Sequence, residues 1–284
     1  MRRALLYVAL LSACDDELDQ RLAIIDAPRV LAVISTPAEA KPGAQISYQA
    51  VLASPDGPLA TVPAWAFCTA PKPPTEDNVA SVDCIAGEGV IDLGTGARAT
   101  GMLPADGCLR FGPDTPPGGF RPRSPDETGG YYQPVRVVAD DLLAIGLTRI
   151  TCKLPTAPTE IARAYDLAYV ANTNPTLEPL VLTTVPADTD VTLTASWPAS
   201  AVETYLHFDP VSQTLVDRRE AMRVSWFATG GALDVDASLV DEQDVATSAS
   251  TTWHTPSPGT AWLWLVLRDS RGGVAAQALA ITVE

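Results

Sequence analysis

The stretch that decides the fold lies near the C-terminus and reads Ala261-Trp262-Leu263-Trp264-Leu265-Val266-Leu267-Arg268. Successive side chains of a β-strand point to opposite faces. Alternation therefore assigns one set to a core face: Ala261, Leu263, Leu265 and Leu267. The other set faces outward: Trp262, Trp264, Val266 and Arg268. Gly272-Gly273 marks a turn, and Ala275–Val283 is a second strand-like stretch. The pattern predicts a closing β-hairpin.

Upstream of this hairpin, short apolar stretches alternate with turn residues. The expected strands are Leu180–Thr184, Val191–Trp197, Arg223–Ala228 and Thr247–Trp253. Between them, Pro198–Ala221 is expected to be an irregular insertion. Many short strands separated by turns favour an all-β sandwich.

One of these strands carries a family resemblance. Val224-Ser225-Trp226-Phe227-Ala228-Thr229-Gly230-Gly231 is similar to the central strand of bacterial immunoglobulin-like and polycystic-kidney-disease-like (PKD-like) domains. Thr252–Pro256 and the closing hairpin resemble the segments that follow in those domains, so the resemblance covers about residues 180–284. It departs at Ala261, where those domains usually carry Tyr. The resemblance implies a seven-stranded sandwich that serves as a spacer, an adhesive module or a partner-binding domain.

The first half of the chain also shows short apolar stretches separated by turn residues. Ile46, Tyr48, Ala50 and Leu52 alternate with more polar residues, which indicates a half-buried strand. Further strands are expected at Val62–Cys68, Ser81–Ile85, Gly89–Leu93, Tyr131–Val138 and Thr148–Leu154, with a short helix from Thr159 to Ala164. Pro104–Gly130 holds six Pro and six Gly and is expected to be a long loop.

These patterns, together with the resemblance, predict a mainly β protein with two immunoglobulin-like β-sandwich domains in tandem, the first with a long Pro/Gly-rich insertion. The polar, proline-bearing stretch from Asn172 to Pro179 suggests the boundary. The predicted domains are residues 22–174, a β-rich unit with disulfides, and residues 175–284, the immunoglobulin-like or PKD-like unit.

The N-terminus has the order of an export signal. Arg2 and Arg3 precede the apolar run Ala4–Leu11, which is far shorter than the ~20 residues that span a bilayer. Leu11-Ser12-Ala13-Cys14 resembles the bacterial lipobox. The resemblance implies cleavage of residues 1–13, acylation of Cys14 and a lipidated tether over residues 14–21. An ordinary signal peptide with a coincidental Cys is the alternative.

Charge limits the partners of the chain. Its net charge is −15, and loss of Arg2 and Arg3 with the signal would leave 17 basic against 34 acidic side chains, or −17. Such a chain repels phosphate backbones and anionic lipids, so no nucleic-acid partner is expected and the lipid must supply membrane attachment. The predicted location is the extracytoplasmic cell envelope. The outer membrane is favoured, and Asp15, which resembles an inner-membrane retention signal, keeps the inner membrane open.

Four cysteines remain after Cys14. An exported chain meets oxidising conditions, and four cysteines allow three disulfide connectivities. The favoured pairing is Cys68–Cys84 with Cys108–Cys152, because each bridge would close a proline-rich excursion. Zinc binding is the rival interpretation, but no C-x-x-C pair and no nearby His supports it.

The leading functional hypothesis is a non-catalytic binding or structural module without a cofactor or metal. The chain carries no G-x-S-x-G, H-E-x-x-H or EF-hand motif. Trp262 and Trp264, expected to face outward, either pack on the insertion or the first domain, or form an exposed aromatic patch for a protein or glycan partner. The alternative function is an envelope hydrolase or accessory subunit with a site near the 104–130 loop.

Overall fold

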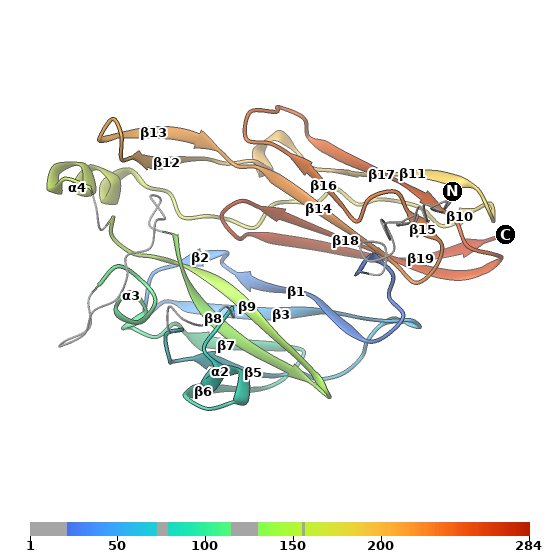
Figure 1. The fold of residues 1–284 in the computed structure, drawn as a ribbon, viewed down its shortest axis with the longest axis horizontal. Helices are drawn as coiled ribbons and strands as arrows, with labels where there is room; N and C mark the ends of the chain where they lie inside the picture. Colours follow the sequence, from blue (N-terminus) through green and yellow to red (C-terminus); the bar gives the residue numbers. More distant parts are fainter. Residues whose placement is uncertain (1–21, 73–78, 115–129, 155–156) are drawn as a thin grey trace, which may run out of the picture.

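The structure is a computed structural model, and it describes residues 22–72, 79–114, 130–154 and 157–284. The predicted signal peptide, Cys14 and the tether lie outside the described residues. The described chain is mainly β and forms two sandwiches, which lie one above the other in Figure 1. The predicted fold class is therefore confirmed.

Four sheets, numbered I to IV here, build the two sandwiches. The first sandwich, which is the lower unit in Figure 1, consists of sheets III and IV. Sheet III comprises β1 (Arg29–Thr36), β3 (Gln45–Ser54), β4 (Gly57–Pro58) and β7 (Arg98–Met102). Sheet IV has the order β2 (Glu39–Ala40), β9 (Leu142–Thr151), β8 (Gly130–Ala139), β5 (Ala64–Cys68) and β6 (Val90–Thr95). Tyr48, Trp65 and Phe67 are the large aromatic residues of the core between them.

The second sandwich consists of sheets I and II. Sheet II has the order β10 (Thr184–Val185), β19 (Val274–Val283), β18 (Gly259–Asp269), β14 (Met222–Ala228) and β16 (Ala237–Val240). Sheet I has the order β11 (Asp190–Ser196), β17 (Ser248–His254) and β15 (Ala232–Leu233). The core residues predicted on β18, namely Ala261, Leu263, Leu265 and Leu267, are all buried in the core of this sandwich.

The expected irregular insertion is a β-hairpin. Antiparallel pairing joins β12 (Thr204–Asp209) to β13 (Thr214–Arg219), after a short 3-10 turn at Ala199–Ala201. Phe208, Leu206 and Leu215 of this hairpin pack on helix α4 (Thr159–Ala168) from the first half of the chain. The hairpin and α4 lie together at one end of the molecule, opposite the C-terminus (Figure 1).

Two other elements differ from expectation. The segment predicted as a strand at Ser81–Ile85 forms the N-cap and most of helix α2 (Val82–Ala86) instead. Ser81 accepts a hydrogen bond from the Cys84 amide at 3.3 Å, and Gly87 ends the helix in a left-handed conformation. Because both capping positions are filled by favourable residues, a single helical turn replaces the strand. The predicted helix at 159–164 is present and extends to Ala168.

The two sandwiches pack face to face. The outer face of sheet II meets the outer face of sheet III in a third apolar core, so the layers follow the order I, II, III, IV. Residues of this core come from β18, β19, β14, β1 and β3: Trp264, Val266, Val274, Leu31, Ala32 and Ala53 are buried in it. Burial of this much apolar surface makes the orientation of the two units part of the fold.

The first described residues belong to the second sandwich. Ala23 is buried in its core, and the Ile25 amide donates a 2.8 Å hydrogen bond to the Ala228 carbonyl at the end of β14. The chain then crosses to the first sandwich at β1. The predicted first domain, 22–174, therefore begins with residues that stabilise the other unit.

Candidate functional site at the junction of the two sandwiches

A buried polar cluster joins the two sandwiches at the end that carries α4. Its centre is Arg271, in the turn between β18 and β19, which is 2% exposed. The guanidinium group pairs with Glu220 at 2.7 Å and with Glu203. It also donates hydrogen bonds to the Tyr169 hydroxyl at 3.2 Å and the Val170 carbonyl at 3.1 Å. A planar five-donor cation is suited to such a site, because it can pair with several acceptors at once.

The first sandwich supplies the other half of the cluster. Glu39 of β2 and Arg149 of β9 form a buried ion pair at 3.1 Å. The same Glu39 carboxylate accepts hydrogen bonds from the Tyr169 hydroxyl at 2.7 Å and the Asn172 amide at 2.9 Å. Tyr169 thus connects Glu39 of the first sandwich to Arg271 of the second.

The linker closes the cluster with two asparagines. Asn172 donates a 3.1 Å hydrogen bond to Asp269, whose carboxylate also accepts from the amides of Arg271 and Gly273. Asn174 donates to the Ser35 carbonyl at 2.7 Å and accepts from the Val274 amide at 2.8 Å. The start of the predicted domain boundary is therefore hydrogen-bonded to both units, with Asn172 buried and Asn174 half-buried. A flexible interdomain linker would not make these contacts.

Three carboxylates and one guanidinium group lie close together in this cluster. Arg271 pairs with the carboxylates of Glu203 and Glu220, and Asp269 interacts electrostatically with Glu220 and Arg271. Burial, reinforced by repulsion from Asp269, raises the pKa of Glu220 to about 7 despite the Arg271 partner. Burial also raises the pKa of Asp269. Burial raises the pKa of Tyr169 to about 12, so its hydroxyl keeps its proton and remains a donor to Glu39 at neutral pH.

A cavity of about 400 Å³ lies against this cluster. It is bounded by the ends of β2 and β9, by α3 (Gly107–Arg110) and by α4. Tyr169 and Thr151 line the cavity, and both donate hydrogen bonds to Glu39. The cavity and the buried cluster therefore share a wall.

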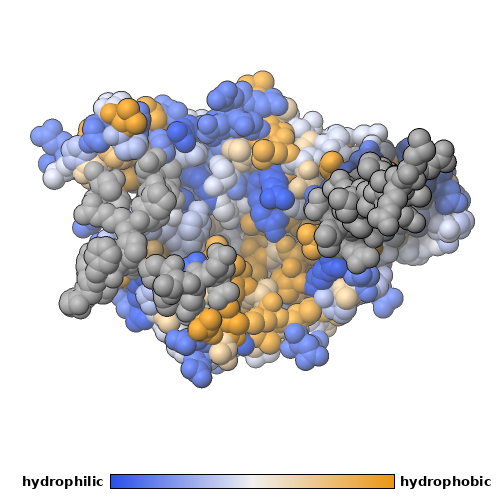
Figure 2. All heavy atoms as spheres, in the orientation of Figure 1, coloured by the Kyte–Doolittle hydropathy of each residue, from blue (hydrophilic) through white to orange (hydrophobic). Residues whose placement is uncertain are grey.

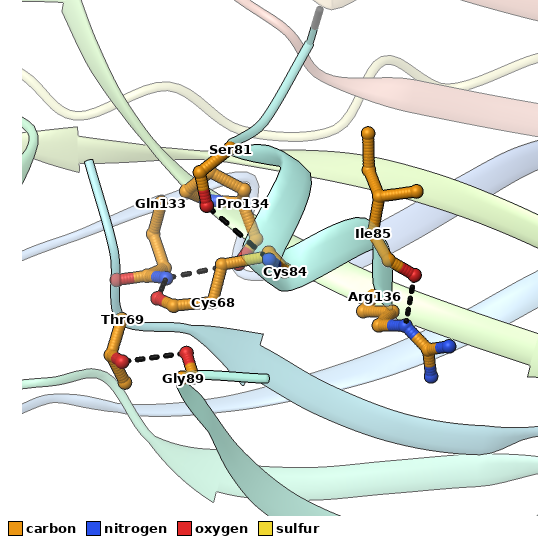
Figure 3. Close-up of a disulfide and its surroundings, with 9 residues drawn as sticks. All are labelled: Cys68, Thr69, Ser81, Cys84, Ile85, Gly89, Gln133, Pro134 and Arg136. Atoms are coloured by element: carbon orange, nitrogen blue, oxygen red, sulfur yellow. Dashed lines mark hydrogen bonds between the residues drawn. A yellow bond between two sulfur atoms is a disulfide. The ribbon is translucent and has the colours of Figure 1, made fainter. Parts of the chain in front are cut away.

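Both predicted disulfides are present. Cys108–Cys152 joins α3 to the end of β9 and lines the cavity. Cys68–Cys84 ties the end of β5 to α2 (Figure 3). The Gln133 amide group supports the second bridge by donating to the carbonyls of Cys68 and Pro134 at 2.8 and 2.9 Å (Figure 3). Two bridges fit an extracytoplasmic compartment, where disulfides persist.

The outward-facing tryptophans are covered by the first sandwich. Trp264 is 1% exposed and Trp262 is partly buried, and their rings stack with centroids 6.2 Å apart. The hypothesis that they form an exposed patch for a protein or glycan is therefore wrong, because sheet III occupies that face. The alternative, that they pack on the first domain, is confirmed.

Apolar surface is exposed elsewhere. Figure 2 shows apolar side chains gathered over β1 and the β8–β9 ribbon, and Leu143 and Leu147 of β9 are both 43% exposed. The residue alternation in the first half of the sequence does not predict this surface. Its residues belong to strands whose bounds the sequence predicts only approximately.

The alternative of a hydrolase site near the 104–130 loop stays a prediction, because the structure describes only part of that loop. Of the 104–130 loop proposed for a hydrolase, residues 115–129 lie outside the described residues, and residues 107–110 form α3. The chain has two histidines: His207 belongs to β12, and His254 at the end of β17 pairs with Asp190 at 2.8 Å in an exposed position. Within the described ranges, no three or more His, Cys, Asp or Glu side chains are grouped to hold a metal ion. In those same ranges no helix has the length and apolar character needed to cross a membrane.

Sequence comparison leaves the family open, since no protein-family model and no curated protein matches the chain. Among solved structures, the fibronectin(III)-like modules of Clostridium thermocellum CbhA are 11% identical, with 92% of this chain and 90% of that chain covered and a TM-score of 0.27. Domains 4 and 5 of the S-layer protein SbsC are 8% identical, with coverages of 90% and 98% and a TM-score of 0.23. The D0-D1 domain of intimin is 13% identical, with coverages of 89% and 98% and a TM-score of 0.22. These TM-scores are too low for the likeness to support an inference about family, partner or activity.

Proposed function

We propose that this chain is a lipid-anchored protein of the cell envelope that acts as a non-catalytic structural or binding module, with its two sandwiches held as one rigid body. The junction between the two sandwiches is the observation that supports the proposed rigid body. A shared apolar core and a buried ionic cluster both span the two units. A module of this kind presents its surfaces at fixed relative positions, as a spacer or a docking platform requires.

The anchor rests on the sequence. The order of basic residues, apolar run and Leu11-Ser12-Ala13-Cys14 supports acylation of Cys14, and the acidic body makes electrostatic membrane binding unfavourable. A tether of residues 15–21 spans at most roughly 25 Å when fully extended. The body would therefore stay close to the bilayer, with the outer membrane favoured.

The test of the anchor is a Cys14→Ser variant expressed in a bacterium beside the unmodified chain. We expect the unmodified chain to incorporate labelled fatty acid and to fractionate with membranes. The variant should take up no label and leave the membrane fraction. Acyl labelling and membrane fractionation of the variant at the level of the unmodified chain would refute the assignment. Cys68→Ser serves as the matched control, because it removes a cysteine without touching the lipobox and should retain the label.

A further inference from the structure

The cavity beside α4 is lined by lysines, a residue type that is rare in this chain. Only three lysines occur in the sequence, and two of them, Lys41 and Lys153, line this one cavity. Lys41 follows β2 and Lys153 follows β9, and these two strands pair in parallel, with Ala40 opposite Ile150. Because parallel strands end at the same edge of a sheet, both lysines leave from one side of the cavity.

Both lysine side chains are exposed to solvent. In the part of the chain that the structure describes, the ammonium groups of Lys41 and Lys153 have no hydrogen-bond or ion-pair partner. Glu39, the carboxylate behind the wall, is already neutralised by Arg149 and by donors from Thr151 and Tyr169. The lining holds two cations, Lys41 and Lys153, and two anions, Asp114 and Asp166, so its formal charge is zero in a chain of net charge −15.

The remaining lining is largely apolar. It includes Ala40, Ala171 and the Cys108–Cys152 disulfide on one side. On the other side, Tyr165 and Tyr169 stack with ring centroids 4.6 Å apart. The volume of about 400 Å³ falls within the usual range of small-molecule sites, roughly 300–1,000 Å³. Asp114 and Asp166 also line the cavity and would repel an anion, which limits the affinity expected.

We propose that this cavity binds a small organic anion, with a carboxylate placed between Lys41 and Lys153 and an apolar body against the tyrosines and the disulfide. This inference goes beyond the scaffold role and is independent of the anchor. Its assay measures binding to the purified full-length chain, so failure of one proposal does not imply failure of the other.

The test is calorimetric titration with benzoate, with benzamide as its uncharged isostere and inorganic phosphate as an anion without an apolar body. We expect benzoate to bind and both comparison ligands to bind much more weakly. Lys41→Gln and Lys153→Gln should each weaken benzoate binding about threefold, and together about tenfold. Asp166→Asn should change the affinity in the opposite direction and tighten benzoate binding about twofold.

The chain offers a matched control in its third lysine. Lys72 lines a different cavity, so Lys72→Gln should leave the affinity for benzoate unchanged. All of the substituted side chains are exposed, and the thermal midpoints of the variants should match that of the unmodified chain. The proposal is overturned if benzoate does not bind at millimolar concentration, if benzamide binds equally well, or if the double lysine variant binds benzoate like the unmodified chain.

Discussion

Arg271 shows how one residue can set the relative placement of two domains. Its guanidinium is buried, and its partners come from the second sandwich and from the linker that reaches Glu39 of the first. A buried charge is tolerated only where its partners are complete, and removal of one partner leaves the others uncompensated. The junction therefore depends on this side chain far more than on any exposed ion pair.

Replacement of Arg271 by Met should be strongly destabilising, because it leaves the buried carboxylate of Glu220 and the half-buried carboxylate of Glu203 without a cation. We expect a loss of about 3–5 kcal/mol in the free energy of unfolding, measured by urea titration. Arg163→Met, at an exposed position of α4, is the matched control and should cost less than about 0.5 kcal/mol. Equal effects of the two substitutions would show that the buried cluster contributes nothing specific.

Glu220 makes the stability of the junction depend on pH. Its pKa is raised by burial from 4.5 to about 7, so the folded state binds the proton more tightly than the unfolded state. This contribution to stability is complete below the unfolded pKa and is lost as the pH rises through about 7.

We expect Glu220→Gln, which mimics the protonated side chain, to gain stability relative to the unmodified chain between pH 5 and pH 8. Urea midpoints at the two pH values measure the difference. The exposed Glu88→Gln should show no such change between the two pH values. A Glu220→Gln variant whose stability relative to the unmodified chain is the same at pH 5 and pH 8 contradicts the interpretation.

Among the elements, the β3–β4 turn, which ends at Gly57, makes a close contact with the second sandwich. Gly57 has φ +117°, and a Cβ built there would lie 2.5 Å from Cε2 of Trp262. Only glycine allows the backbone of this turn to approach the indole so closely. The packing of β18 against sheet III therefore relies on a residue without a side chain.

Gly57→Ala should force the turn away from Trp262 and destabilise the protein by about 1–3 kcal/mol beyond the backbone strain. Gly43→Ala is the control for that strain, since Gly43 has φ +80° and nothing lies within 4 Å of its added Cβ. Denaturant unfolding of both variants gives the difference. If Gly57→Ala costs no more than Gly43→Ala, the close contact has no energetic role.

The sequence predicts an element well where the residues that determine its structure are close together along the chain. Alternation along β18 correctly separated Leu263 and Leu265 from the tryptophans, because strand periodicity is local. Neither periodicity nor spacing could bring Glu39 to Tyr169 across 130 residues of sequence. The β12–β13 hairpin was missed for the same reason, since its apolar side is defined by α4.

On the scale of the whole molecule, four sheets stack as successive layers. The two sandwiches are not independent domains joined by a flexible linker. Three apolar cores alternate with the sheets, and the middle core contains residues of both units. The N-terminal segment at Ala23 and Ile25 adds a second crossing between the units. Unfolding one sandwich would expose Trp264 and the ionic cluster of the other, so the two should unfold together.

Differential scanning calorimetry of the disulfide-intact chain tests this central claim most directly. The account predicts one transition, with a van't Hoff enthalpy equal to the calorimetric enthalpy. Two resolved transitions, or a van't Hoff enthalpy about half the calorimetric value, would mean that the sandwiches unfold independently and would contradict the rigid two-unit body.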